Sequence, residues 1–240
     1  MWILFAFGSA LFAGLTSILA KCGIKNTDSN AATAIRTIIV LIFSWIMVFL
    51  VGAQHSIGNV SVKTWTFLIL SGLATGASWL CYFRALQIGD VDKVVPVDKS
   101  SAILSILLAF IFLHESISPL KLLCVVLIGV GTYLMITKKG TSSENSGKKG
   151  WRWFFYALGS AVFASLTSIL GKVGIENIDS NLGTAIRTIV VLIMAWIVVF
   201  VTKKQDSVRT IDHRELGFIC LSGLATGCLL YTSPSPRDTR

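Results

Sequence analysis

Long apolar runs separated by short polar segments dominate the chain. A helix that crosses about 30 Å of hydrocarbon needs roughly 20 predominantly apolar residues. Such stretches predict membrane-spanning helices at 2–20, 31–51, 65–86, 95–113, 120–136, 153–170, 183–201 and 216–231. Apolar and polar residues do not alternate within them with period two, as they would in a membrane β-barrel. The pattern therefore predicts an all-α integral membrane protein.

Composition supports a lipid environment and argues against several other classes. Hydrophobic residues make up 54% of the 240 and charged residues only 14%, against about 25% charged in soluble domains. The net charge of +9 is spread over short loops, so we expect the lipid bilayer and not nucleic acid as a partner. The five cysteines form no CxxC pair and have no histidine spacing suited to zinc, so we expect no metal and no cofactor.

A long internal repeat organises the chain. Residues 2–76 align with 153–227 at a constant offset of 151 without a gap, and NTDSN, AIRT and SGLATG recur as NIDSN, AIRT and SGLATG. A Lys/Gly/Ser-rich linker at 138–151 separates the copies. We expect a first module at 1–137 with five helices, and a second module at 152–227 that begins the same series and shows three.

The odd number of helices predicts that the second module enters the membrane in the opposite sense. Inverted repeats of this kind surround the midplane binding sites of many carriers. The basic residues agree, because Lys25 is replaced by Glu176 while the second loop of the second copy gains Lys203 and Lys204. By the excess of Lys and Arg in cytoplasmic loops, the charges favour an external amino terminus.

The chain resembles the EamA family of the drug/metabolite transporter superfamily. The resemblance covers about residues 1–227 and rests on the first helix with its terminal lysine, on DSN…TAIRT, on GLATGASWLCYFRAL at 72–86, and on VVPVDKSSAILSILLAFIFLHE at 94–115 followed by GVGTYL. It implies a multi-pass exporter or exchanger of small metabolites in a bacterial-type cytoplasmic membrane, with about ten helices in two halves. Members of the family are usually drawn with both termini in the cytoplasm, so the absolute topology stays open.

The repeat stops after Gly227, where ASWLCYFRAL in the first module corresponds to CLLYTSPSPR in the second. Proline removes a backbone donor and clashes with the preceding turn, so the two Ser-Pro pairs do not continue a span. We expect residues 228–240 to be a non-native tail and the second module to be truncated. A short natural polar tail is the alternative.

Four basic residues at equivalent positions are candidates for a substrate pathway: Lys21, Arg36, Lys172 and Arg187. Charges at membrane depth are costly and are functional hypotheses by default. They would attract an anionic group, for which arginine offers a bidentate fork. The alternative is that they reach the interface along apolar stems and set topology.

Asp98 and Lys99 follow Pro96 near the expected start of the fourth helix. They are either a helix cap or an acid–base pair in the pathway, with Asp98 and Glu115 as possible proton relays. Trp79 lies within a span and either lines a substrate cavity or faces lipid.

Small residues suggest close helix packing. Gly72 and Gly76 form a GxxxG motif that recurs as Gly223 and Gly227, and Gly129 and Gly131 lie in the fifth helix. Glycines at this spacing let helix backbones approach closely.

A secondary carrier that works by alternating access between two inverted modules is the leading functional hypothesis, and no catalytic residue is assigned. A flippase-like or small structural membrane subunit acting on lipid-linked substrates is the alternative, and a membrane-embedded enzyme is less favoured because the three histidines fall in loops. A homodimer is a further possibility. Substrate, coupling ion and direction of transport are not encoded in any recognisable motif.

Overall fold

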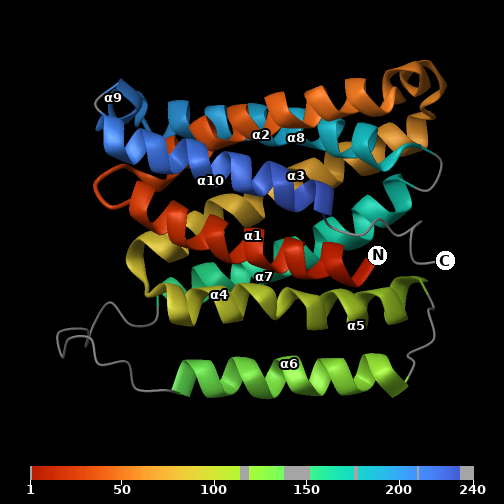
Figure 1. Ribbon diagram of the computed structural model, residues 1–240, viewed down its shortest axis with the longest axis horizontal. Coiled ribbons are helices and arrows are strands. Elements are labelled where there is room, and N and C mark those ends of the chain that lie inside the picture. Colours follow the sequence, from red (N-terminus) through yellow and green to blue (C-terminus); the bar gives the residue numbers. More distant parts are fainter. Residues whose placement is uncertain (1, 114–118, 138–151, 176–177, 210, 233–240) are drawn as a thin grey trace.

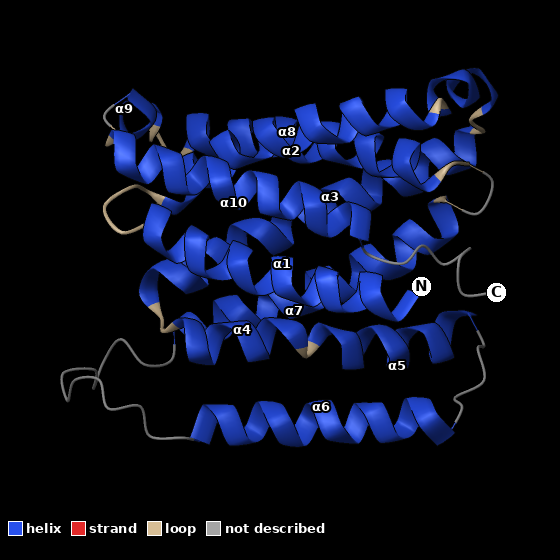
Figure 2. Ribbon diagram, viewed as in Figure 1, coloured by secondary structure: helices blue, strands red, loops and turns tan. Residues whose placement is uncertain are grey.

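The computed structural model describes residues 2–113, 119–137, 152–175, 178–209 and 211–232. Helices account for nearly all of this part of the chain, and no strand occurs in it (Figure 2). This confirms the all-α prediction. The elements are α1 (Trp2–Gly23), α2 (Ser29–Val51), η1 (Ala53–Asn59), α3 (Val62–Ile88), α4 (Val91–Lys99), α5 (Ser101–Leu113), α6 (Pro119–Thr137), α7 (Arg152–Gly174), α8 (Ser180–Val201), α9 (Gln205–Arg209) and α10 (His213–Thr232).

Each expected span contains a helix, with one correction. The fourth span is two helices, α4 and α5, separated at Ser100. The Ser100 hydroxyl donates to the Val97 carbonyl at 2.6 Å, in competition with the regular backbone pattern. The helix therefore breaks near the middle of the molecule.

Five stretches of the described residues are long and apolar enough to cross a membrane: Ser29–Val51, Val62–Ile88, Val91–Phe112, Arg152–Gly174 and Ser180–Val201. Two further apolar helical segments, Phe7–Gly23 and Pro119–Met135, are shorter. Large apolar side chains such as Leu50, Leu120 and Val201 are exposed on the outside, where lipid tails are as apolar as they are. The protein is a multi-pass membrane protein.

The two copies of the repeat are intertwined. Helix α1 packs mainly against α10, and α7 packs mainly against α3, so the first helix of each copy lies against the third helix of the other (Figure 1). The contacts are equivalent: a Cβ atom on Gly23 would meet Ile219, and one on Gly174 would meet Leu68. Helix α6 lies at the edge beside α4 and α5.

The second copy is inverted relative to the first. Gly223 and Gly227 of α10 face Ile39 and Phe43 of α2 in the same order along both helices, so α10 runs parallel to α2. Within one module, α2 and α3 run in opposite directions. Since α10 is the counterpart of α3, corresponding helices of the two modules point in opposite directions, as the odd helix count predicted.

Both copies leave their second helix through a left-handed residue. Gly52 ends α2 with φ 74°, and the residue 151 positions later, Lys203, has φ 52°. Glycine adopts this conformation without steric penalty, whereas a residue with a Cβ atom does not. The backbone of the repeat thus keeps its shape where its sequence has changed.

Candidate functional site

A cavity of about 160 Å³ lies between the two modules. Its walls come from seven helices, including α1, α2 and α3 of the first module and α7 and α10 of the second. The lining residues are Ala13, Thr16, Ser17, Arg36, Ser78, Trp79, Tyr82, Asp98, Lys99, Ser101, Ala164, Thr226 and Leu229. Most of these side chains are small or polar, so the cavity is a polar chamber inside an apolar protein.

Arg36 is the most deeply buried charge of the cavity, with 4% of its surface exposed. It lies two turns into α2, whose first turn is capped by the Asp28 carboxylate accepting from the Asn30 N–H at 2.9 Å. Ala32 and Val40, four positions away on either side, are also buried and place Arg36 on the inward face. The sequence of α2 therefore directs a guanidinium into the protein.

The Arg36 guanidinium touches both modules. Its Nη1 donates to the Thr226 Oγ1 at 2.9 Å. Its Cζ atom lies 4.5 Å from the centroid of the Trp79 ring and 4.2 Å from that of Phe83, within range for cation–π attraction. The Nε atom has no hydrogen-bond partner among the described residues.

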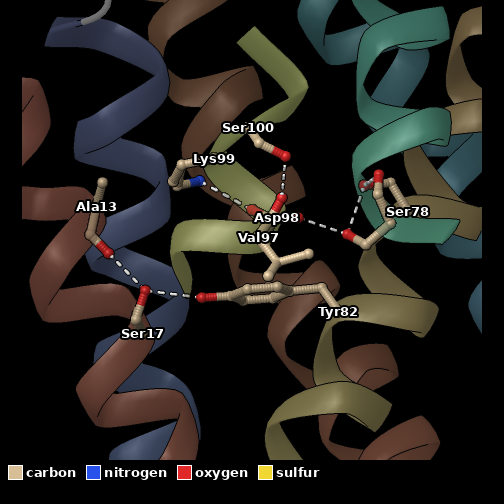
Figure 3. A network of polar contacts seen from close by, with 9 residues as sticks. Ala13, Ser17, Ser78, Tyr82, Val97, Asp98, Lys99 and Ser100 are labelled. Carbon is tan, nitrogen blue, oxygen red and sulfur yellow. Dashed lines mark hydrogen bonds and ion pairs between the residues drawn. The ribbon is translucent and has the colours of Figure 1, made fainter. Parts of the chain in front are cut away.

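Asp98 lies at the end of α4 and is 7% exposed. Helix α4 begins at Val91, with Asp90 in the N-cap position, so the interpretation of Asp98 as a helix cap is wrong. Its Oδ1 accepts from the Ser160 hydroxyl of α7 at 2.5 Å, and its Oδ2 lies 3.2 Å from the Lys99 Nζ. The carboxylate therefore links the two modules and is paired with a cation (Figure 3).

Hydroxyl groups extend this network across the cavity (Figure 3). The Ser78 hydroxyl of α3 donates to the Ser160 carbonyl at 3.1 Å. On the other side, the Ser17 hydroxyl of α1 donates to the Ala13 carbonyl at 3.0 Å and lies 2.8 Å from the Tyr82 Oη. Since Ser17 has only one proton, Tyr82 is the donor of that pair.

Arg187 is the counterpart of Arg36 in the second module. Its Nη2 donates to the Thr75 Oγ1 at 3.1 Å, and Thr75 is the counterpart of Thr226. Gly171 leaves room for it, since a Cβ atom there would lie 3.0 Å from the Arg187 Nη1. Arg187 is not among the residues that line the cavity, and no aromatic ring is recorded over its guanidinium among the described residues, unlike that of Arg36.

Lys21 and Lys172 lie outside the cavity lining as well. The Lys21 Nζ donates to the backbone carbonyls of Leu86 and Gly89, the latter at 2.6 Å. These carbonyls form the carboxyl end of α3, which attracts cations. Lys172 is half-buried in α7, and Glu115 lies outside the described residues.

Glu215 was missed by the sequence reasoning. It is 7% exposed at the start of α10 and accepts from the Asn26 backbone N–H at 3.0 Å, the Asn26 Nδ2 at 2.8 Å and the Thr27 Oγ1 at 2.5 Å. These three bonds join the α1–α2 loop of one module to α10 of the other. We call them the Glu215 clasp.

A signal for the clasp was present in the repeat. At the positions corresponding to Thr27 and Glu215, the other copy has Ile178 and Thr64. Both members of the pair thus differ between otherwise similar copies, which is the pattern expected of a contact made at one end of the molecule only.

Comparison with known proteins decides the family. A sequence model of the EamA-like transporter family matches residues 1–137 and 151–233. The chain belongs to the EamA-like transporter family. It is also 41% identical over 134 residues to a protein from Sinorhizobium sp. named "Uncharacterized transporter in cobO 3'region", a match that spans 56% of this chain and 95% of the relative. Family and relative both point to a membrane transporter and not to an enzyme.

The relative is short for a two-module protein. The 134 matched residues make up 95% of it, so its length is about that of the first module of this EamA-like chain, residues 1–137. The match therefore relates the chain to a protein of about one module, and says nothing of how two modules cooperate.

In this EamA-like transporter, the GxxxG motifs lie at close helix contacts. A Cβ atom on Gly72 would lie 2.7 Å from the Val190 Cβ, and one on Gly76 would lie 2.7 Å from the Met194 Sδ. Gly223 and Gly227 approach Ile39 and Phe43 in the same way.

The glycines of α6 differ from these motifs. The nearest atom to a Cβ on Gly129 would be the Ile103 Cδ1 at 3.9 Å, an ordinary contact, and a Cβ on Gly131 would meet no described atom within 4 Å. Within the described residues, the expected close packing at Gly131 is therefore not found, because α6 lies at the edge and buries little of its surface.

Proposed function

We propose that the chain is a secondary transporter of small metabolites, with the central cavity as its substrate site. The observation that supports this most directly is that both inverted modules contribute to one polar chamber, with Arg36 and Asp98 of the first module bonded to Thr226 and Ser160 of the second. A change in the relative position of the modules would alter these bonds and the walls together. Such a change is what alternating access requires.

The Glu215 clasp supports a gate at one end of the pathway. It joins elements of different modules, so the modules cannot separate at that end while its three bonds persist. The Lys204 Nζ lies 3.7 Å from the Asp28 Oδ2 beside it and adds a weaker, more exposed ion pair. In the other copy the positions of Thr27 and Glu215 carry Ile178 and Thr64, so the second end would close by different contacts.

A cross-linking experiment tests the gate and the function together. We suggest a background in which Cys22, Cys81, Cys124, Cys220 and Cys228 are replaced by serine, with the double substitution Thr27→Cys and Glu215→Cys. In proteoliposomes with a panel of radiolabelled small metabolites, at least one solute should exchange. Oxidation should stop the exchange and a reductant should restore it.

The controls are the two single-cysteine variants, in which oxidation should leave exchange unchanged. Exchange that continues with the cross-link in place would refute the gate. A panel in which no solute exceeds the uptake of empty liposomes would count against the proposed transport of small metabolites.

Asp98 is the residue through which a proton could be coupled to transport, since it is a buried carboxylate bonded to both Lys99 and Ser160. Asp98→Asn keeps the shape and removes the titration. If Asp98 carries the coupled proton, the pH dependence of exchange should disappear in this variant. Wild-type rates with an unchanged pH profile would rule out that role.

A further inference from the structure

The charges that line the cavity do not cancel. Arg36 and Lys99 are cationic, and Asp98 is the one carboxylate among the lining residues. Asp98 is already paired with Lys99 at 3.2 Å. Within the part of the chain that the structure describes, no carboxylate forms an ion pair with Arg36.

An unpaired buried guanidinium is unfavourable, since arginine does not deprotonate in proteins and an uncompensated charge in a low dielectric is costly. The Thr226 hydroxyl and the faces of Trp79 and Phe83 compensate it only in part. The Nε donor is left without a partner in the described residues. The missing partner is one negative charge.

We propose that Arg36 forms the anion subsite of the cavity and that the substrate carries a single carboxylate. A planar carboxylate can accept two parallel hydrogen bonds from the guanidinium edge. A single negative charge balances the one uncompensated positive charge of Arg36. A phosphate dianion would bring one negative charge too many, and a zwitterion would add a positive charge of its own, so that the cavity would keep its net charge. Trp79 and Ala13 in the lining offer apolar contacts to the rest of a small organic acid.

The pseudo-equivalent Arg187 supplies a contrast. It also donates to a threonine and also has an Nε without a hydrogen-bond partner among the described residues, but it does not line the cavity. The anion subsite is therefore assigned to Arg36 alone.

That the bound acid is also the transported substrate rests on the proposed function, but the binding test does not need transport. The full-length protein in nanodiscs is titrated calorimetrically with acetate, propionate and benzoate, and with the neutral amide of each acid. Inorganic phosphate and the zwitterion phenylglycine complete the set. We expect at least one carboxylate to bind at least tenfold more tightly than its amide, phosphate and phenylglycine.

Three variants locate the subsite. Arg36→Gln should weaken carboxylate binding about tenfold or more, as expected for the loss of a charged hydrogen-bond donor. Arg36→Lys keeps the charge but loses the fork and should give a smaller loss. Arg187→Gln, the matched control, should bind as the wild type does. If Arg36→Gln does not fold, the proposal is still tested by two measurements. These are the comparison of carboxylate with amide on the wild type, and carboxylate binding by the Arg36→Lys variant.

Several results would overturn the proposal. They are equal binding of acid and amide by the wild type, tighter binding of phosphate or phenylglycine, carboxylate binding that survives Arg36→Gln, and equal losses in Arg36→Gln and Arg187→Gln. Failure of the proposed function looks different, since a carboxylate would then bind through Arg36 but no solute would cross the liposome membrane.

Discussion

Arg36 and Arg187 occupy the same position in two copies of one module, yet they serve different surroundings. Both follow an Ala-Ile dipeptide, and both donate to the equivalent threonine of the partner module. Arg36 lies against two aromatic rings and lines the cavity. Among the described residues, Arg187 has neither a ring contact nor a place in the cavity lining. An identical motif therefore does not guarantee an identical role, because the third helix and the broken fourth span supply the rest of the site.

The largest expected effect separates the two arginines. Arg36→Ala should reduce solute exchange about 10- to 100-fold, because it removes a charged donor from the cavity. Arg187→Ala should change the rate only a few-fold, since its side chain does not line the chamber. Exchange rates in proteoliposomes, normalised to the amount of reconstituted protein, measure both. Equal losses would mean that the two sites are functionally equivalent.

The GxxxG motifs allow the packing of the two copies to be compared. A Cβ atom on Gly72 would lie 2.7 Å from the Val190 Cβ, whereas one on Gly223 would lie 3.1 Å from the Ile39 Cβ. We expect Gly72→Ala to destabilise the protein by about 1–3 kcal/mol, the usual cost of overpacking, and Gly223→Ala to cost less. Thermal unfolding in detergent measures the difference. A larger destabilisation by Gly223→Ala than by Gly72→Ala would show that α8 shifts to accommodate the added methyl group more easily than α2 does.

Replacing the aromatic wall makes the surroundings of Arg36 more like those of Arg187, which has no recorded ring contact among the described residues. Trp79→Leu removes one cation–π contact, worth about 0.5–2 kcal/mol. We therefore expect anion binding to change by up to about tenfold while folding is retained. Calorimetry of the variant checks this, with Trp45→Leu, which lies outside the cavity lining, as the control. An unchanged affinity would assign Trp79 a packing role.

The smallest effect concerns the left-handed residue after the second helix. Lys203 has φ 52°, where the first module has Gly52. Lys203→Gly should raise the free energy of unfolding by about 1 kcal/mol, because glycine adopts this conformation without strain. Gly52→Ala is the converse change and should lower it. Chemical or thermal unfolding in detergent gives the sign of each, and a loss of stability in Lys203→Gly would mean that its side chain makes a stabilising contact.

Much of the site was visible in the sequence, but not its assembly. Arg36, Trp79, Asp98 and Lys99 were among the predicted pathway residues and all line the cavity. Lys21 and Arg187 were predicted on the same grounds and lie elsewhere, at the end of α3 and beside Gly171. A charge within an apolar run is visible locally, but whether it faces a chamber depends on which helix packs against it. The alternative that Asp98 caps a helix arose because the start of its helix was placed four residues too late.

The sequence by itself determined the helices, the repeat and the inversion, because apolar length, self-similarity and an odd helix count are properties of the chain alone. Tertiary structure decided the exchange of partners, in which α1 packs on α10 and α7 on α3. It also decided the Glu215 clasp and the cavity. The surfaces of these helices are similarly apolar, so hydropathy does not distinguish one neighbour from another. Only the fit of specific glycines, threonines and arginines across the interface selects the pairs.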